Sequence, residues 1–232
     1  MESNTAAKRI SAGAIARATA AIIMAVLLLT VTSFSFIKFL SGAKTVTSTE
    51  DLKEGAYVRL EIPRALAYTA ESYSSAKKVT ARFMIIPMEG RLLTIRLPER
   101  YFSSADEIIK QTNDMLTSGI HGNKYIVIEG TVSTMTQSAY DYSSKWVKEN
   151  MSSLVGREII TSSENIEEYL SDFVINADHI GAFSSNFAIT IYILTAILII
   201  YALFEIFMPR KKIDDNTDIK SDSKAAEEEE EE

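Results

Sequence analysis

The sequence predicts an α+β protein in which two transmembrane helices flank a small extracytoplasmic β-rich domain. Three observations predict this class: two long uncharged runs near the ends of the chain, alternating apolar residues between them, and basic residues beside both runs. The domain is expected to be a curled antiparallel sheet or an OB-like barrel with two or three packed helices. A chain of 232 residues has room for one such domain besides the two helices.

The two uncharged runs have the length of membrane-spanning helices. The first has 20 residues between Arg17 and Lys38, and the second extends from Ser185 to Phe204. At about 1.5 Å per residue, a helix of this length spans about 30 Å, the thickness of a bilayer core. Ser41-Gly42-Ala43 resembles a signal-peptidase site, so cleavage of the first run is the alternative to an uncleaved anchor.

Basic residues beside the two runs set the predicted orientation. They are Lys8, Arg9, Arg17, Arg210, Lys211 and Lys212. Because basic flanks stay in the cytoplasm, both termini are expected there, with residues 41–184 on the outer side of the cell membrane. The predicted segments are a cytoplasmic N-terminal segment (1–17), a first transmembrane helix (18–40), a tether (41–54), an extracytoplasmic α+β domain (55–184), a second transmembrane helix (185–208) and a disordered acidic cytoplasmic tail (209–232).

Composition excludes several classes of function. The chain has no cysteine, so disulfides and thiolate chemistry are excluded, and an outer domain without cysteine favours a bacterial origin. The net charge is −7, and residues 41–184 contain 15 basic and 19 acidic residues. Without a basic excess, nucleic-acid binding has no electrostatic support.

Period-two alternation predicts the strands of the outer domain. In Ala56–Ile62 the apolar residues Val58, Leu60 and Ile62 alternate with charged ones, as in a half-buried strand. Glu89-Gly90 lies between two apolar runs and predicts a hairpin turn. The other expected strands are 79–88, 91–98 and 124–136, with 66–73 as a strand or a helical turn and 157–160 as a possible last strand.

Two helices and one irregular strand position complete the predicted domain. Ser104 and Glu107 match a capping box that would start a helix, which Gly119 would end. A second helix is expected through Tyr140–Val155, and a short one at 163–170 leading back to the membrane. Gly130 inside a strand predicts a bulge or a sharp bend.

No catalytic, cofactor-binding or metal-binding residue is predicted. S-x-x-K occurs at Ser74–Lys77 without the companion motifs of penicillin-binding proteins. His121 and His179 are expected in loops, and Asp178 beside His179 could make a weak ion site, but no further ligand converges on it. An aromatic cluster is the one candidate for contact with a partner, although packing in the core is the alternative. Its members are Tyr140, Tyr142 and Trp146.

One ionisable residue and a set of small residues characterise the two predicted spans. Glu205 lies inside the second span, close to the cytoplasmic Arg210, so a structural role near the surface is expected. Ala21 and Ala25 have the spacing of a small-residue helix contact. The first span is therefore expected to pack on the second or on a partner.

The pattern of the domain resembles a known kind of membrane protein. The stretches EGAYVRLEIP, MIIPMEGRLLTIRLPE and YIVIEGTVSTM resemble two-span membrane proteins of Gram-positive bacteria from families labelled as domains of unknown function. The layout is also similar to cytochrome oxidase assembly factors of the SURF type. The Gly-Trp and Asn-Arg-Gly motifs of that family are absent, so this second likeness is architectural only.

The favoured function is non-enzymatic: a scaffold, assembly factor or accessory subunit whose outer domain binds a membrane or envelope protein. A membrane-tethered hydrolase-like enzyme is the alternative, together with a sensor that couples the outer domain to the acidic tail. The expected partners are the lipid bilayer and a protein, with no nucleic acid. A homo-oligomer remains open.

Overall fold

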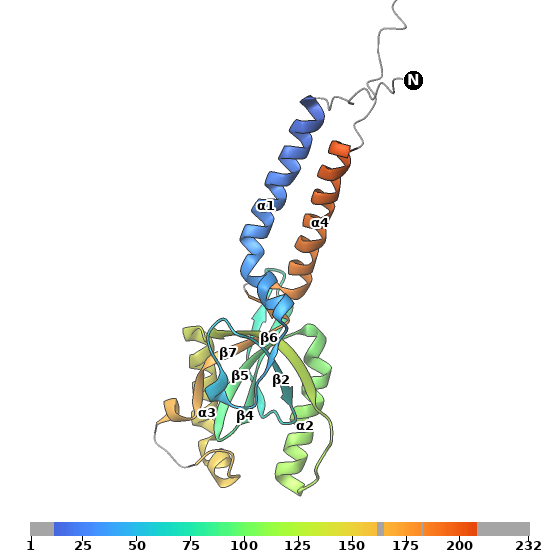
Figure 1. The fold of residues 1–232 in the computed structure, drawn as a ribbon. Helices are drawn as coiled ribbons and strands as arrows, with labels where there is room; N and C mark the ends of the chain where they lie inside the picture. Colours follow the sequence, from blue (N-terminus) through green and yellow to red (C-terminus); the bar gives the residue numbers. More distant parts are fainter. Residues whose placement is uncertain (1–11, 162–164, 182, 208–232) are drawn as a thin grey trace, which may run out of the picture. The chain divides into compact units, whose positions relative to one another are not determined.

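The computed structural model describes residues 12–161, 165–181 and 183–207 (Figure 1). The predicted disordered tail and most of the N-terminal segment lie outside these residues. The chain divides into two compact units. One consists of Met1–Thr30 with Tyr192–Glu232, and the other is Val31–Ile191.

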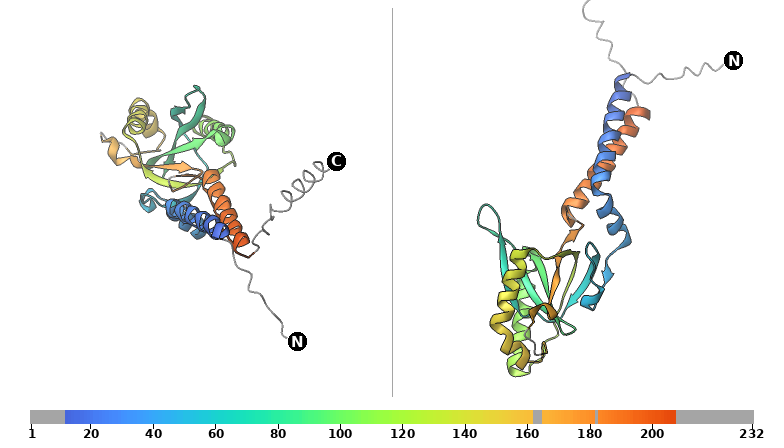
Figure 2. Two further views of the ribbon diagram at one scale, coloured as in Figure 1. Left: turned by 90° about the horizontal axis from the view of Figure 1, so that it is seen from above. Right: turned by 90° about the vertical axis from the view of Figure 1, so that its left-hand side faces the viewer.

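The first unit contains the larger parts of two helices, α1 (Ala12–Ser41) and α4 (Ser185–Phe207), whose remaining residues belong to the second unit. Both helices are long and apolar enough to cross a membrane. Within this unit the helices lie side by side and antiparallel (Figure 2), with the small side chains of Ala18, Ala21 and Ala202 buried between them. Small residues permit this close approach because no long side chain separates the two backbones.

The second unit contains a seven-stranded mixed sheet in the order β1-β2-β6-β7-β5-β4-β3. The strands are β1 (Lys44–Thr45), β2 (Tyr57–Ile62), β3 (Ala67–Tyr73), β4 (Val79–Met88), β5 (Arg91–Pro98), β6 (Ile126–Thr134) and β7 (Leu170–Ala177). The prediction of an antiparallel sheet is wrong, because β1 runs parallel to β2 and β5 parallel to β7. The prediction of an OB-like barrel is also wrong, since the sheet of the described residues is open, with β1 and β3 at its edges.

Strand β7 is the central element that the sequence analysis missed. It lies between β6 and β5, and five of its eight residues are buried. The prediction of a last strand at 157–160 is wrong, because those residues form a turn and bends after α3. The short helix expected at 163–170 is reduced to the 3-10 turn η3 (Ile166–Glu168) that precedes β7. Short elements complete the unit: η1 (Thr49–Asp51), η2 (Glu99–Tyr101), β8 (His179–Ile180) and β9 (Phe183–Ser184).

Two helices cover opposite faces of the sheet: α2 (Phe102–Ser118) and α3 (Gln137–Gly156) (Figure 1). Alternation along the strands divides the core between them. Met84 and Ile86 of β4 point to the face covered by α2, whereas Ile85 points to the face covered by α3. Because β4 and β5 are buried on both faces, their sequences are largely apolar without regular alternation.

The ends of these helices confirm one predicted signal and correct another. Gly119 ends α2 in the left-handed conformation with φ 66°, as its position predicts. The capping box at Ser104 and Glu107 is wrong: α2 begins at Phe102, directly after η2, so Ser104 already lies inside the first turn. Thr136 caps α3 instead, accepting a hydrogen bond from the backbone N–H of Ala139.

Gly90 and Gly130 are required in the sheet for two different structural reasons. The predicted Glu89-Gly90 turn joins β4 to β5, and both residues have positive φ, 46° and 77°. Gly130, in contrast, makes no bulge, because its register with β2 and β7 is regular. A Cβ atom there would strike the backbone carbonyl of Asn176 on β7, so close approach of the neighbouring strand requires the glycine.

Candidate functional site

The three aromatic residues predicted to contact a partner all lie on α3, but they do not form one exposed cluster. Tyr140 and Trp146 are half-buried and pack against the core beneath α3. Tyr142 is 58% exposed and points away from that core. Trp146 is nevertheless placed where a partner can reach it, because it borders a surface pocket.

That pocket is one part of a longer groove. The pocket beside Trp146 has a volume of about 250 Å³ and shares four lining residues with a second pocket of about 480 Å³. A third, of about 360 Å³, adjoins the second. We call the three adjoining pockets the distal groove. Its shared lining residues are Arg64, Leu66, Thr112, Met115, Leu116, His121, Arg157 and Ile159.

The distal groove lies at the end of the sheet where β4 turns into β5. Pro87, Glu89 and Gly90 contribute to its wall. Its floor is apolar, formed by residues such as Leu66, Leu116 and Ile159. The side chains of Arg64 and Arg157 are exposed at the rim, and neither makes an ion pair with a described residue. Glu89 and Glu158 are exposed at the same rim, so its charges are mixed. An apolar floor inside a polar rim is typical of a surface that binds another protein.

Side-chain hydrogen bonds hold one wall of the distal groove in place. Gln111 of α2 donates to the carbonyl of Lys124 at 3.0 Å and accepts from its N–H at 2.9 Å. A Cβ atom on Gly122 would collide with the Gln111 side chain, so this loop packs tightly on α2. Thr112, buried at 2% exposure, accepts from the N–H of Ala65. The groove is therefore preformed.

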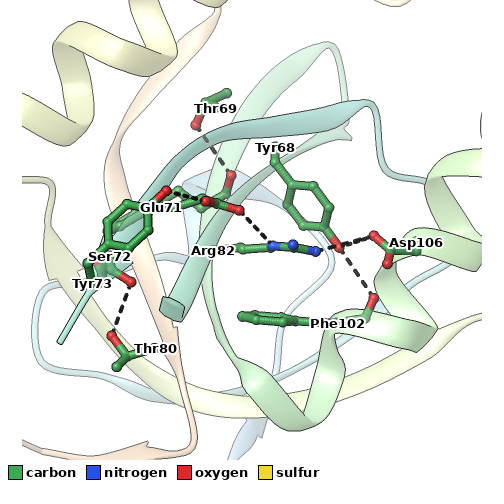
Figure 3. A network of polar contacts seen from close by, with 10 residues as sticks. Tyr68, Thr69, Glu71, Ser72, Tyr73, Thr80, Arg82, Phe102 and Asp106 are labelled. Atoms are coloured by element: carbon green, nitrogen blue, oxygen red, sulfur yellow. Dashed lines mark hydrogen bonds and ion pairs between the residues drawn. The ribbon is translucent and has the colours of Figure 1, made fainter. Parts of the chain in front are cut away.

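A polar network lies elsewhere in the domain, around Arg82 of β4 (Figure 3). The guanidinium stacks between the rings of Tyr68 and Phe102, with its carbon 4.9 Å and 4.5 Å from the two ring centroids. It donates to Glu71 at 2.9 Å and lies 3.7 Å from Asp106 of α2. The network joins the edge hairpin β3–β4 to the start of α2.

The protonation chemistry of the Arg82 network favours a structural role. Burial, together with the hydrogen bond donated to Asp106, raises the pKa of Tyr68 to about 12. The hydrogen bond from Tyr73 and that from Arg82 hold the pKa of Glu71 below its ordinary value. An arginine stays protonated at any physiological pH. None of these groups is poised to exchange a proton near neutrality, as a catalytic acid or base would be.

A second cluster joins the ends of β2, β6 and β7. Tyr57 donates to Glu129 at 2.9 Å, and burial, with this hydrogen bond, raises the pKa of Tyr57 to about 12. Asp178 accepts hydrogen bonds from Arg100 and, at 3.0 Å, from Tyr101. His179 is oriented by its own backbone neighbour, because Nδ1 lies 3.1 Å from the carbonyl of Ala177 and a carbonyl can only accept. Nδ1 therefore carries the hydrogen.

The histidines and the S-x-x-K stretch do not converge on a chemical centre. His121 lies on the distal groove and His179 at the other end of the sheet. Lys77 lies in the β3–β4 turn with φ 58° and Ser74 makes turn hydrogen bonds there. Among the described residues, no three His, Asp or Glu side chains are grouped as metal ligands.

Glu205 has a partner that the sequence analysis did not assign. Its side chain is 4% exposed and accepts from Arg17 of α1 at 2.9 and 3.1 Å, one bond to each carboxylate oxygen. Tyr201 donates to the same carboxylate at 3.0 Å. Arg17 had been interpreted as a flank, but α1 begins at Ala12 and includes it. The pair could have been predicted by aligning the two apolar runs antiparallel, because that alignment places Arg17 opposite Glu205.

The fold and its grooved surface define a class of protein: an open mixed α/β sheet inserted between two helices that are apolar enough to span a membrane. The chain belongs to the family described as Domain of unknown function (DUF8577), whose model matches residues 7–208. No curated protein shows a significant match to it. The bacterial and Gram-positive origin stays a prediction.

Proposed function

We propose that the protein is a two-pass membrane protein whose α/β domain binds a protein partner through the distal groove. It then acts as a non-enzymatic scaffold, assembly factor or accessory subunit. The observation that carries this proposal is the preformed groove with an apolar floor, a rim of two arginines and two glutamates, and Trp146 at one end. A partner segment that fits has an apolar anchor flanked by side chains of both charges.

The membrane location is supported by the outer surfaces of α1 and α4. Large apolar side chains are exposed along both helices; among them are Ile15, Ile22, Leu27, Ile193, Ile197 and Phe204, each 45% or more exposed. Water would disfavour such a surface by about 25 cal/mol per Å², whereas lipid would not. The antiparallel pairing of 12–30 with 192–207 supports both termini lying on one side of the membrane, and the basic flanks favour the cytoplasm as that side.

Binding in the distal groove is tested by site-specific crosslinking in native membranes. A photoreactive amino acid replaces Trp146 in the full chain, and an otherwise identical chain carries it at Lys145, one position along α3, whose side chain is 73% exposed. We expect one near-stoichiometric partner to crosslink from position 146 and not from position 145. The variant Arg64→Glu with Arg157→Glu should abolish that crosslink, because the rim pocket shared by these residues would then present only acidic charges and would no longer match the partner.

Two results contradict the proposed binding. Crosslinks of equal yield from both positions would mean non-specific contact, and no crosslink from position 146 would remove the groove as a binding surface. The membrane orientation is tested separately. Protease added to intact cells should cut within residues 41–184 and spare a tag on either terminus, and loss of a tag would overturn the orientation.

A further inference from the structure

A second concave surface lies at the opposite end of the sheet from the distal groove. Its volume is about 610 Å³. It is lined by the end of the β3–β4 hairpin, the end of β5, the end of β7 and the first residues of α4. We call it the proximal pocket; its polar side chains include Lys78, Glu99, Arg100, His179, Ser185 and Asn186.

Hydrogen bonds attach the proximal pocket directly to the beginning of α4. Both the N–H and the hydroxyl of Ser185 donate to the carbonyl of Asp178, at 2.7 and 2.9 Å. The pocket wall and the first residues of α4 therefore belong to the same unit, Val31–Ile191, and are joined directly by these two hydrogen bonds.

An apolar surface begins where the polar pocket ends. Phe187 and Ile189 of α4 are 52% and 40% exposed, and no charged residue follows along the helix before Glu205. The ring of Phe187 lies 5.5 Å from that of Phe183, a tilted aromatic pair at the border. Polar groups directly beside exposed apolar groups match the chemistry of a phospholipid, in which the headgroup adjoins the acyl chains.

The charges of the proximal pocket are balanced and accessible. Lys78 and Glu99 form an ion pair at 2.7 Å whose side chains are 67% and 59% exposed. Exposed pairs of this kind contribute little and exchange readily for other partners. Arg100 is 62% exposed and is paired with Asp178. Two cations face two carboxylates, so a ligand with one group of each sign fits better than a purely anionic one.

We propose that the proximal pocket binds the zwitterionic headgroup of a phospholipid that carries a phosphate and a primary ammonium group. The phosphate would bind Lys78, and the ammonium would bind Glu99, so the two ends of the headgroup would take the places of the two partners in this exposed ion pair. The inference rests on the proposed membrane location. It adds a lipid class and a site to it, and it is independent of the distal groove.

Native mass spectrometry of the full chain in detergent tests the lipid preference. Phosphatidylethanolamine and phosphatidylglycerol with identical acyl chains are added in equal amounts. We expect the wild type to retain the ethanolamine lipid about tenfold more strongly, a difference of about 1.4 kcal/mol. Soluble phosphoethanolamine should compete with it, whereas inorganic phosphate should not.

Two double variants separate the pocket from general lipid contact. Lys78→Gln with Glu99→Gln should abolish the preference, since both charged contacts are removed without changing the net charge. Lys145→Gln with Glu149→Gln removes a comparably exposed pair on α3, with side chains 73% and 61% exposed, and should leave the preference intact.

Equal retention of the two lipids by the wild type would overturn the proposal, as would a preference that survives Lys78→Gln with Glu99→Gln. Neither result bears on membrane orientation, which the protease experiment measures. If the protein were not inserted in a membrane, the protease experiment would not show protected terminal tags. The lipid comparison would still measure the preference of the proximal pocket.

Discussion

At the scale of single residues, Arg82 contacts two acidic side chains and two aromatic rings at once. Replacing Arg82 with alanine removes the stacking of its guanidinium on two rings and also the ion pair with Glu71. We expect Arg82→Ala to lower the free energy of unfolding by roughly 2 kcal/mol, because a partly desolvated cation–π contact contributes about 1–2 kcal/mol and the ion pair adds to it. Thermal unfolding of the full chain in detergent measures the loss.

Two further variants show whether stacking or charge matters at Arg82. Arg82→Lys keeps the charge but not the planar group between Tyr68 and Phe102, so its loss should be intermediate. Arg59→Ala is the control for a surface pair, because Arg59 and Glu129 are 52% and 44% exposed, and it should cost less than about 1 kcal/mol. Equal losses in Arg82→Ala and Arg59→Ala would contradict the stacking argument.

Tyr68 predicts a dependence of stability on alkaline pH. Its pKa rises from 10.0 in the unfolded chain to about 12 in the folded protein, so the folded state favours the neutral phenol. The stabilisation is complete below pH 10 and is lost as the pH rises from 10 to about 12. In Tyr68→Phe the fall in unfolding temperature across this window should be smaller. Tyr142→Phe, at a position 58% exposed, should show the wild-type fall.

At the scale of elements, the β4–β5 turn carries a residue that its backbone does not favour. Glu89 has φ 46° and is followed by Gly90 at φ 77°, as in a type I′ turn, whose first position prefers Asn, Asp or Gly. We expect Glu89→Asn to stabilise the protein by roughly 0.5–1 kcal/mol, since asparagine tolerates the left-handed region at lower cost. Gly90→Ala should destabilise it, and a stabilised Gly90→Ala would refute this reading of the turn.

Local elements were predictable where pattern and turn chemistry agree. The alternation of β2, the Glu89-Gly90 turn and the Gly119 helix end all appear where the sequence places them. The capping box at Ser104 failed because η2 already starts the helical turn at Glu99, so the helix needs no side-chain cap there. Gly130 was misassigned because the close approach of β7 is a tertiary contact, invisible in the strand itself.

Strand order was not predictable, and it decided the class of sheet. The stretch LSDFVINA lies between a polar turn and the second apolar run. Its polar residues Ser171, Asp172 and Asn176 interrupt the apolar ones, so no regular alternation is visible. Its place between β6 and β5 comes from burial on both faces, which no local signal encodes. The candidate site was predictable only in part. Trp146 was predictable as an aromatic residue on a helix, but Arg64 and Arg157 come together only because the fold brings their two loops to the same end of the sheet.

At the scale of the whole molecule, the ion pair between Arg17 and Glu205 links residues that lie 188 positions apart. A carboxylate buried among apolar side chains costs several kcal/mol unless its charge and its hydrogen-bonding capacity are satisfied. The alanines beside the pair let the two helices approach, and Arg17 then neutralises Glu205. The second apolar helix therefore depends on the first for its charge balance.

This dependence predicts a particular order among variants. Arg17→Ala removes two hydrogen bonds and an opposite charge from the Glu205 carboxylate, whose side chain is 4% exposed, and should lower the free energy of unfolding. The double variant Arg17→Ala with Glu205→Ala should recover most of that loss, because no buried charge remains. Leu27→Ala, at a position of α1 that is 56% exposed, is the control and should unfold as the wild type does. Unfolding in detergent of the full chain measures all three, and additive losses in the double variant would show that the pair does not hold the helices together.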